Sequence, residues 1–280
     1  AARKYGFEQA ASDEKEVLDD PEINTVVLLT RHNEHARQAV AALSAGKHVY
    51  CEKPPALTEQ ELSRLEAKAA RPDAPQFLVG YNRRFSPLGA ELKSFCAGHA
   101  EPLWMHYRVN AGELPLTHWL HNPEIGGGRI IGEGCHFVDF LTFLCGSLPV
   151  SVSAAGLPDG ERYRQDNVSI TLEFADGSVG VVSYIANGDR TLAKEHLEVS
   201  FAGKSAVLDD FRALHLYTGG NHRRITGRGQ NKGQKEAWNA FVDSLISGVP
   251  AIPLTEITAV SRATFQAVRA LSSRRRETIA

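Results

Sequence analysis

Up to about residue 82, short apolar segments alternate with amphipathic ones. Residues 23–30 (INTVVLLT) are β-branched and apolar on both faces, which is typical of a strand buried in a parallel sheet. Residues 33–46 follow with helical periodicity and end at a glycine. The same unit continues as a strand over 47–52, a helix over 58–70 and a strand over 76–81. This alternation predicts a parallel sheet with helices on both faces.

After about residue 100 the pattern changes. Predicted strands now follow one another closely, at 101–112, 150–156, 165–174, 178–185, 195–202, 205–209 and 213–217. A helical run covers 129–146, and two helices, at 232–247 and 255–273, close the chain. Between the last predicted strand and these helices we expect a mobile loop over 219–233. Successive antiparallel strands with segregated helices predict an α+β domain.

The chain has 280 residues, of which 42% are hydrophobic and 23% charged, and its formal net charge is −2. This length allows two domains with their own cores, which we place at 1–83 (α/β, doubly wound) and 84–280 (α+β). The near-neutral charge gives no general attraction to nucleic acid or to an anionic membrane. No apolar stretch approaches the roughly 20 residues that a membrane span needs. The four cysteines show no CxxC spacing and indicate reduced thiols in a cytoplasmic protein.

The strand over 47–52 leads directly into Glu52 and Lys53, and two prolines then fix the backbone. Ligands of parallel sheets gather at the C-terminal ends of the strands, where Thr30, Lys53 and Asn82 all fall. A lysine held there is partly desolvated, which would lower its pKa from about 10.4. It could then exchange a proton with a substrate hydroxyl. A surface lysine paired with Glu52 is the alternative.

A second candidate site begins at three consecutive glycines, Gly126–Gly128, which let the backbone approach a ligand closely before the helical run starts. On that run His136 and Asp139 are three residues apart and share one face. An imidazole titrates near neutral pH and can act as acid or base, although a purely structural histidine is the alternative. No third ligand lies at a spacing that suits zinc, so we predict no metal site.

Together these motifs resemble the Gfo/Idh/MocA oxidoreductases, relatives of glucose–fructose oxidoreductase and inositol dehydrogenase. The resemblance rests on VVLLTRHNEHARQAVAAL, GKHVYCEKP, VGYNRRFSP and GGGRIIGEGCHFVDFLTFLCG, which occur in this order across nearly the whole chain. It implies an NAD- or NADP-binding Rossmann domain and a domain with an open, mostly antiparallel sheet that presents the substrate. Substrates of the family are typically sugars, nucleotide sugars or cyclitols, oxidised or reduced at a ring hydroxyl.

The resemblance also implies roles for individual residues. Lys53 is the lysine of the EKP motif, near the nicotinamide and the reacting hydroxyl, and His136 is the acid or base that also touches the substrate. Trp119 lies in the substrate loop, where its ring could cover the apolar face of a sugar, although a core tryptophan is the alternative. The residues expected to line the cofactor are Lys53 together with Thr30, His35, Glu52, Asn82 and Arg84.

The chain departs from the family pattern in two places. The opening strand and its G-x-G-x-x-G turn are absent, and the chain starts without Met in what reads as the end of a helix. We therefore expect a fragment that binds a dinucleotide poorly by itself, similar to the second half of proteins in which a zinc-type alcohol dehydrogenase part comes first. Many relatives also place an Asp four residues before the helix histidine, where this chain has Gly132 followed by Glu133.

These features predict an NAD- or NADP-dependent oxidoreductase module that acts on a sugar-like alcohol or ketone, with Lys53 and His136 as its catalytic groups. We expect a homo-oligomer, a dimer or a tetramer, because large apolar patches seldom stay exposed. One alternative is a non-catalytic ligand-binding or assembly module of the same fold, which the glycine at position 132 would favour. Another is a larger bifunctional enzyme in which this module serves a preceding dehydrogenase part.

Overall fold

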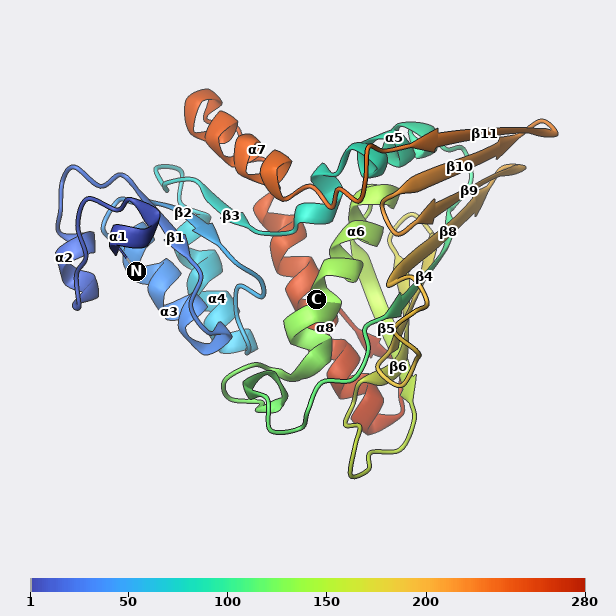
Figure 1. Ribbon diagram of the computed structural model, residues 1–280, viewed down its shortest axis with the longest axis horizontal. Helices are drawn as coiled ribbons and strands as arrows, with labels where there is room; N and C mark the ends of the chain where they lie inside the picture. Colours follow the sequence, from blue (N-terminus) through green and yellow to red (C-terminus); the bar gives the residue numbers. More distant parts are fainter. Residues whose placement is uncertain (1, 280) are drawn as a thin grey trace.

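The computed structural model describes residues 2–279 as two sheets with helices between them (Figure 1). The smaller sheet has parallel strands in the order β1-β2-β3. These strands are β1 (Thr25–Leu28), β2 (His48–Cys51) and β3 (Phe77–Val79). The helices of this part are α1 (Ala2–Tyr5), α2 (Glu14–Leu18), α3 (His32–Ser44) and α4 (Glu59–Ala69). The predicted alternation of strands and helices in a parallel sheet is therefore confirmed.

The start of α4 explains how the chain leaves the end of β2. Thr58 Oγ1 accepts a hydrogen bond from Glu61 N at 3.2 Å, and Glu61 Oε2 accepts one from Thr58 N at 3.2 Å. This capping box satisfies two backbone donors that the first turn of a helix would otherwise leave free. Leu62 and Leu65 then bury one face of the helix. The segment around Lys53 is thus held between a buried strand and a capped helix.

The larger sheet is mostly antiparallel, with strands in the order β11-β10-β9-β8-β4-β7-β6-β5-β12 and a parallel pairing between β4 and β7. Its strands are β4 (Trp104–Asn110), β5 (Pro149–Gly156), β6 (Asn167–Phe174), β7 (Val179–Ile185), β8 (Glu195–Phe201), β9 (Lys204–Asp209), β10 (Ala213–Thr218), β11 (Asn221–Thr226) and β12 (Glu277–Thr278). Along β4, Met105, Tyr107 and Val109 are buried and alternate with residues that face outward. The helices lie on one side of this sheet in Figure 1, and no helix of residues 2–279 is drawn over its other side.

Helices α6 (Cys135–Cys145) and α8 (Leu254–Ser273) lie between the two sheets (Figure 1). The α6 helix is preceded by a π-helical turn, η3 (Ile130–Gly134), a distortion that is frequent at functional sites. The α8 helix packs against α4, α6 and β5 and joins the two parts of the chain. Helix α7 (Gln234–Ser247) precedes it, and α5 (Pro87–Cys96), which the sequence pattern did not predict, begins at the N-cap Ser86.

The prediction of a mobile loop over residues 219–233 is wrong for part of that segment. Residues 221–226 form β11, which pairs with β10 in a hairpin. The hairpin turns at Gly219-Gly220, whose φ angles of +56° and +76° favour glycine. The strand escaped prediction because it lies at the edge of the sheet and exposes polar residues such as Arg223 and Arg224. Such a charged edge has no buried face and therefore no apolar alternation.

None of the helices within residues 2–279 has the length and apolar character that crossing a membrane requires. The four cysteines are buried and free, and burial raises the pKa of each thiol. The division of the chain at residue 83 stays a prediction, since the turn η1 (Asn82–Phe85) spans that position.

Candidate active site

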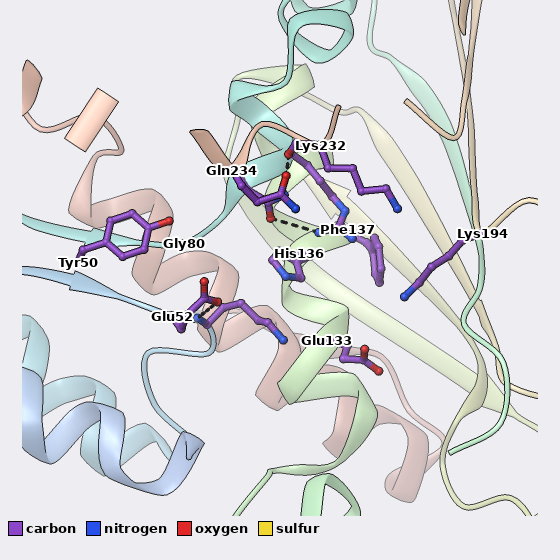
Figure 2. A pocket seen from close by; sticks show the side chains of 12 residues that line it. Tyr50, Glu52, Gly80, Glu133, His136, Phe137, Lys194, Lys232 and Gln234 are labelled. Carbon is purple, nitrogen blue, oxygen red and sulfur yellow. Dashed lines mark hydrogen bonds between the residues drawn. The ribbon is translucent and has the colours of Figure 1, made fainter. Parts of the chain in front are cut away.

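A cavity of about 370 Å³ lies where the C-terminal ends of β2 and β3 meet α6 and the segments that precede β8 and α7 (Figure 2). Such an edge of a parallel sheet is where ligands of this architecture bind. Many of the lining side chains are charged or polar, and they come from segments far apart in the sequence. The lining residues are Tyr50, Glu52, Lys53, Gly80, Asn82, Arg83, Glu133, His136, Phe137, Lys194, Lys232 and Gln234.

Lys53 reaches from the end of β2 to the π-helical turn. Its Nζ donates a hydrogen bond to Gly132 O at 2.8 Å, and its backbone N donates to Glu52 Oε2 at 3.3 Å. The buried His35 secures the backbone around this segment, because its Nδ1 lies 2.8 Å from Pro54 O and its Nε2 lies 3.1 Å from Thr30 O. The side chain of His35 therefore positions the lysine from behind and does not line the cavity.

His136 projects from the first turn of α6 into the same cavity (Figure 2). Its Nδ1 is buried and has no hydrogen-bond partner within residues 2–279. Burial lowers the pKa of His136 well below its ordinary value of 6.5, and the positive charges of Arg83 and Lys53 lower it further. The imidazole is therefore neutral at pH 7 and can accept a proton from a bound hydroxyl.

The glycine at position 132 is required by close packing. A Cβ atom there would lie 2.6 Å from Leu120 Cδ1 and 3.0 Å from Gly126 O. A side chain there would require Leu120 and the backbone at Gly126 to shift, and the backbone carbonyl of Gly132 accepts the hydrogen bond of Lys53. The next residue, Glu133, turns its carboxylate into the cavity, where it accepts hydrogen bonds from Arg129 Nε at 2.5 Å and from the hydroxyl of Tyr184.

Glu133 is held as a carboxylate by this network. Burial by itself would raise its pKa, but the charge of Arg129 and the hydrogen bond from Tyr184 outweigh burial, so that the pKa of Glu133 is lowered. The π-helical turn thus supplies one carboxylate and one carbonyl oxygen close to Lys53. The sequence offered Glu133 only as the neighbour of an unexpected glycine.

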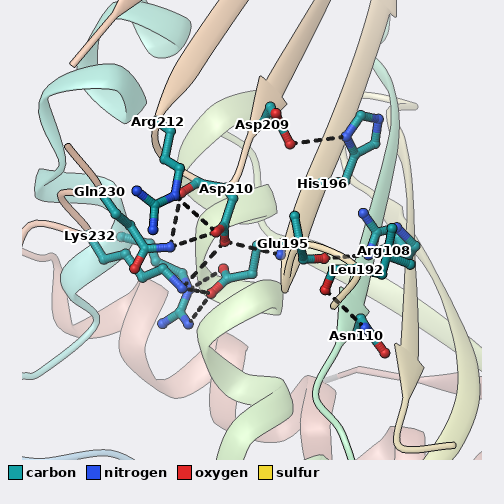
Figure 3. Close-up of polar contacts among 12 residues, drawn as sticks. Arg108, Asn110, Leu192, Glu195, His196, Asp209, Asp210, Arg212, Gln230 and Lys232 are labelled. Atoms are coloured by element: carbon teal, nitrogen blue, oxygen red, sulfur yellow. Dashed lines mark hydrogen bonds and ion pairs between the residues drawn. The ribbon is translucent and has the colours of Figure 1, made fainter. Parts of the chain in front are cut away.

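Three cations of the cavity were not predicted, namely Arg83, Lys194 and Lys232. Two of them pair with the buried Glu195, the first residue of β8. Glu195 accepts hydrogen bonds from Arg83 Nε at 2.7 Å and Nη2 at 2.9 Å, and from Lys232 Nζ at 2.6 Å. Figure 3 shows Asp210 beside this cluster, 3.8 Å from Lys232 Nζ. We call Arg83, Glu195 and Lys232 the cavity cluster.

The charge of Glu195 is strongly favoured by the two cations. Burial would raise its pKa, but the charge and hydrogen bonds of Arg83, followed by those of Lys232, lower the pKa of Glu195 to about 2. Arg83 follows Asn82 directly, so its sequence neighbourhood contained a signal. Lys194 and Lys232 carried no local signal, because only the folded sheet brings them to the strand ends.

Besides His35, two more of the residues predicted to contact the cofactor do not line this cavity. The side chain of Thr30 is exposed and donates to Gln38 Oε1 at 2.7 Å. The side chain of Arg84 is buried away from the cavity. Its Nε lies 3.1 Å from both carboxylate oxygens of Asp139, and its Nη1 donates to Glu256 Oε2 at 2.8 Å. We call Arg84, Asp139 and Glu256 the closed cluster. Glu52 and Asn82, in contrast, lie in the cavity as predicted from the motif positions.

Trp119 lines a second, wider cavity of about 930 Å³ rather than the first one. Its ring packs edge-on against His32, with ring centroids 4.8 Å apart, and the guanidinium carbon of Arg31 lies 5.7 Å from its centroid. The structure therefore groups Trp119 with the start of α3 and separates it from Lys53 and His136. Within residues 2–279 no group of three or more His, Cys, Asp or Glu side chains has a geometry that could hold a metal ion.

Comparison with known proteins places this geometry in a family. Residues 1–81 match the model described as "Oxidoreductase family, NAD-binding Rossmann fold", and residues 99–207 match the "GFO/IDH/MocA C-terminal domain". Levoglucosan dehydrogenase of Pseudarthrobacter phenanthrenivorans is 28% identical over 275 residues, covering 79% of this chain and 69% of that protein. The scyllo-inositol 2-dehydrogenase (NAD(+)) of Bacillus subtilis is 30% identical over 189 residues, covering 65% of this chain and 54% of its own length.

Solved structures show the same fold. Levoglucosan dehydrogenase in complex with NADH and levoglucosan superposes with a TM-score of 0.87 at 22% identity, covering 99% of this chain and 86% of that one. An NAD binding oxidoreductase from Klebsiella pneumoniae superposes with a TM-score of 0.89 at 22% identity, covering 100% and 86%. The chain spans about half the length of the inositol dehydrogenases that it matches. Two successive family models over most of its length show that this chain belongs to the Gfo/Idh/MocA oxidoreductase family.

Proposed function

We propose that the protein is an NAD- or NADP-dependent oxidoreductase that interconverts a ring hydroxyl and a ketone of a sugar or cyclitol. The observation that carries this proposal is the meeting of Lys53 and His136 in one cavity at the C-terminal edge of a parallel sheet. The names of the levoglucosan and inositol dehydrogenases among the relatives agree with a polyhydroxylated substrate.

The residues at the strand ends fit a nicotinamide group. His136 Nδ1 is a buried polar atom without a partner in residues 2–279, and Glu52 and Asn82 add an acceptor and an amide at the same edge. The glycine at position 80 lets the side chains of Glu52 and Tyr50 lie close to that edge, because a Cβ there would be 3.3 Å from both Glu52 Oε1 and Tyr50 Oη. When bound, the nicotinamide supplies the hydride acceptor of the oxidation.

The protein's own groups then handle the proton and the charge. The neutral His136 accepts the proton of the substrate hydroxyl. The ammonium group of Lys53 donates a hydrogen bond to the same oxygen as negative charge develops on it. Its existing bond to Gly132 O and the fixed backbone around Pro54 hold it in place for this role.

Replacement of Lys53 by alanine in the full-length protein tests the proposal. We expect kcat to fall by about 10²- to 10⁴-fold while NADH still quenches the tryptophan fluorescence, because Lys53 acts on the reacting oxygen. Replacement of the exposed Lys235, which does not line the cavity, is the matched control and should leave kcat unchanged. A Lys53→Ala variant with full activity would falsify the assignment.

A non-catalytic binding module is the second candidate, because Gly132 stands where the family resemblance implies an aspartate. The same experiment separates the two. Dinucleotide binding without turnover over a panel of sugars and cyclitols, in the unaltered protein, would favour the binding module. The carboxylate of Glu133 and the neutral His136 in the cavity support the enzyme.

We also propose that the protein is a cytoplasmic homo-oligomer that associates through the uncovered face of the larger sheet. Trp104 and Tyr217 are 58% and 41% exposed on outward positions of β4 and β10, and association through this face would cover their aromatic rings. The four free thiols suit a reducing compartment. Light scattering on the full-length protein should give a dimer or tetramer, and a monomer at micromolar concentration would contradict the association.

A further inference from the structure

Lys194 differs from the other cations of the cavity in the contacts that its ammonium group makes within residues 2–279. It directly precedes β8, and its partly buried side chain lines the cavity (Figure 2). Within residues 2–279 its ammonium group has neither a hydrogen bond nor an ion pair. Lys53, in contrast, donates to Gly132 O, and Arg83 and Lys232 both donate to Glu195. The cavity therefore keeps one ammonium group available.

The two carboxylates that most favour the charged form of Lys194 already accept hydrogen bonds from other residues. Glu133 accepts hydrogen bonds from Arg129 and Tyr184, and Glu195 is bonded within the cavity cluster. Burial lowers the pKa of Lys194 even though both carboxylates favour its charged form. A partly desolvated ammonium group without a partner in residues 2–279 is unfavourable, and an incoming anion would relieve that cost.

The positions of the side chains across the cavity indicate where this anion would lie relative to the reacting hydroxyl. Figure 2 shows Glu52 and Lys194 on opposite sides, with His136 between them. A molecule that presents a hydroxyl to His136 and Lys53 would direct its far side toward Lys194. The volume of about 370 Å³ lies near the lower end of the roughly 300–1,000 Å³ found for ligand sites, so beside a nicotinamide it leaves room for a single ring at most.

We propose that the substrate is a single-ring sugar or cyclitol that carries an anionic group, and that Lys194 binds this group. The inference rests on the proposed function, because it names the substrate class of the same site. The group is a carboxylate, as in a uronic acid, or a phosphate, and both present several acceptor oxygens to the three donors of an ammonium group. Lys194 is then a specificity-determining residue that does not touch the reacting atoms.

The test compares three matched series on the full-length protein with NAD and NADP, namely hexuronates, hexose 6-phosphates and the neutral parent hexoses. We expect kcat/KM to be higher for one of the anionic series than for the neutral one. In Lys194→Gln that kcat/KM should fall by about 10- to 100-fold, through KM, while kcat/KM for neutral hexoses should fall much less. Lys194→Arg should recover most of the loss, and the control Lys235→Gln should behave like the unaltered protein.

Calorimetric titration of the same anions keeps the two proposals apart. Binding of a hexuronate or hexose phosphate that Lys194→Gln loses, without any turnover, would contradict the proposed function and support the anion site. Turnover of neutral hexoses at least as efficient as that of both anionic series would overturn the anion site and leave the proposed function intact. Equal losses for neutral and anionic substrates in Lys194→Gln would also overturn it, because Lys194 would then act on every ligand alike.

Discussion

Two neighbouring arginines of the turn η1 lead to two different clusters of buried charge. Arg83 belongs to the cavity cluster with Glu195 and Lys232, and Arg84 belongs to the closed cluster with Asp139 and Glu256. Both side chains are almost fully buried, and each donates hydrogen bonds from Nε and Nη2 to one carboxylate. Burial and pairing alone therefore do not distinguish a site from a structural ion pair.

What differs is the surface that the cluster leaves uncovered. The closed cluster lies between η1, α6 and α8, where protein covers Arg84 and Asp139. The cavity cluster has a wall formed by Arg83 and Lys232 that remains open to a ligand. An ion pair of the first kind orients helices, whereas one of the second kind also sets the electric potential that a substrate meets.

The largest expected effect is a loss of stability on changing the closed cluster, and it distinguishes that cluster from the cavity cluster. Asp139→Asn leaves Arg84 buried with only Glu256 to neutralise it, so the free energy of unfolding should fall by about 3–5 kcal/mol. Urea denaturation measures this loss. Asp243→Asn, on an exposed position of α7, is the control and should change stability little. If Asp139→Asn lowered ligand affinity at unchanged stability, the two clusters would not differ in the way described.

Glu195→Gln should have a smaller effect on stability, of about 2–4 kcal/mol, because water can reach Arg83 and Lys232 through the cavity. It should also change the acid limb of the stability curve. The pKa of Glu195 is about 2 in the folded state against an ordinary 4.5, so the unfolded chain takes up its proton first as the pH falls. This stabilisation is complete above pH 4.5 and disappears toward pH 2.

Denaturation curves at a series of pH values measure that contribution. The difference in unfolding free energy between the unaltered protein and Glu195→Gln should be constant near neutral pH and shrink as the pH falls below about 4.5. A difference that stayed constant down to the acid limit would show that Glu195 is not held as a carboxylate by its two cations.

Gly132→Ala is expected to have the smallest effect and to report on the cavity wall. The added Cβ would lie 2.6 Å from Leu120 Cδ1, which can shift, and 3.0 Å from Gly126 O, which is backbone. We expect a loss of about 1–3 kcal/mol and a lower kcat, because the carbonyl that holds Lys53 must move. Gly98→Ala, where a Cβ meets open space, controls for crowding but adds strain at a φ of +66°. Unchanged kcat in Gly132→Ala would show that the contact to Lys53 is dispensable.

The motifs led to part of the site. Glu52, Lys53 and Asn82 line the cavity because they follow parallel strands, whose C-terminal ends must meet at one edge. His136 joins them because the glycines and the helical pattern mark where α6 begins. Arg84 and Trp119 were assigned by motif position as well, yet their side chains point elsewhere, since a position in a turn or loop does not determine the direction of the side chain.

Local patterns in the chain were sufficient for the parallel unit, the run of antiparallel strands and the presence of a lysine and a histidine suited to proton transfer. Those properties depend on spacing between near neighbours, which periodicity records. The basic wall of the cavity was decided only by the fold, because Lys194 and Lys232 lie more than a hundred residues from Lys53 and share no local signal with it. The choice between an open and a closed cluster was also decided there, because it depends on which helix covers each arginine.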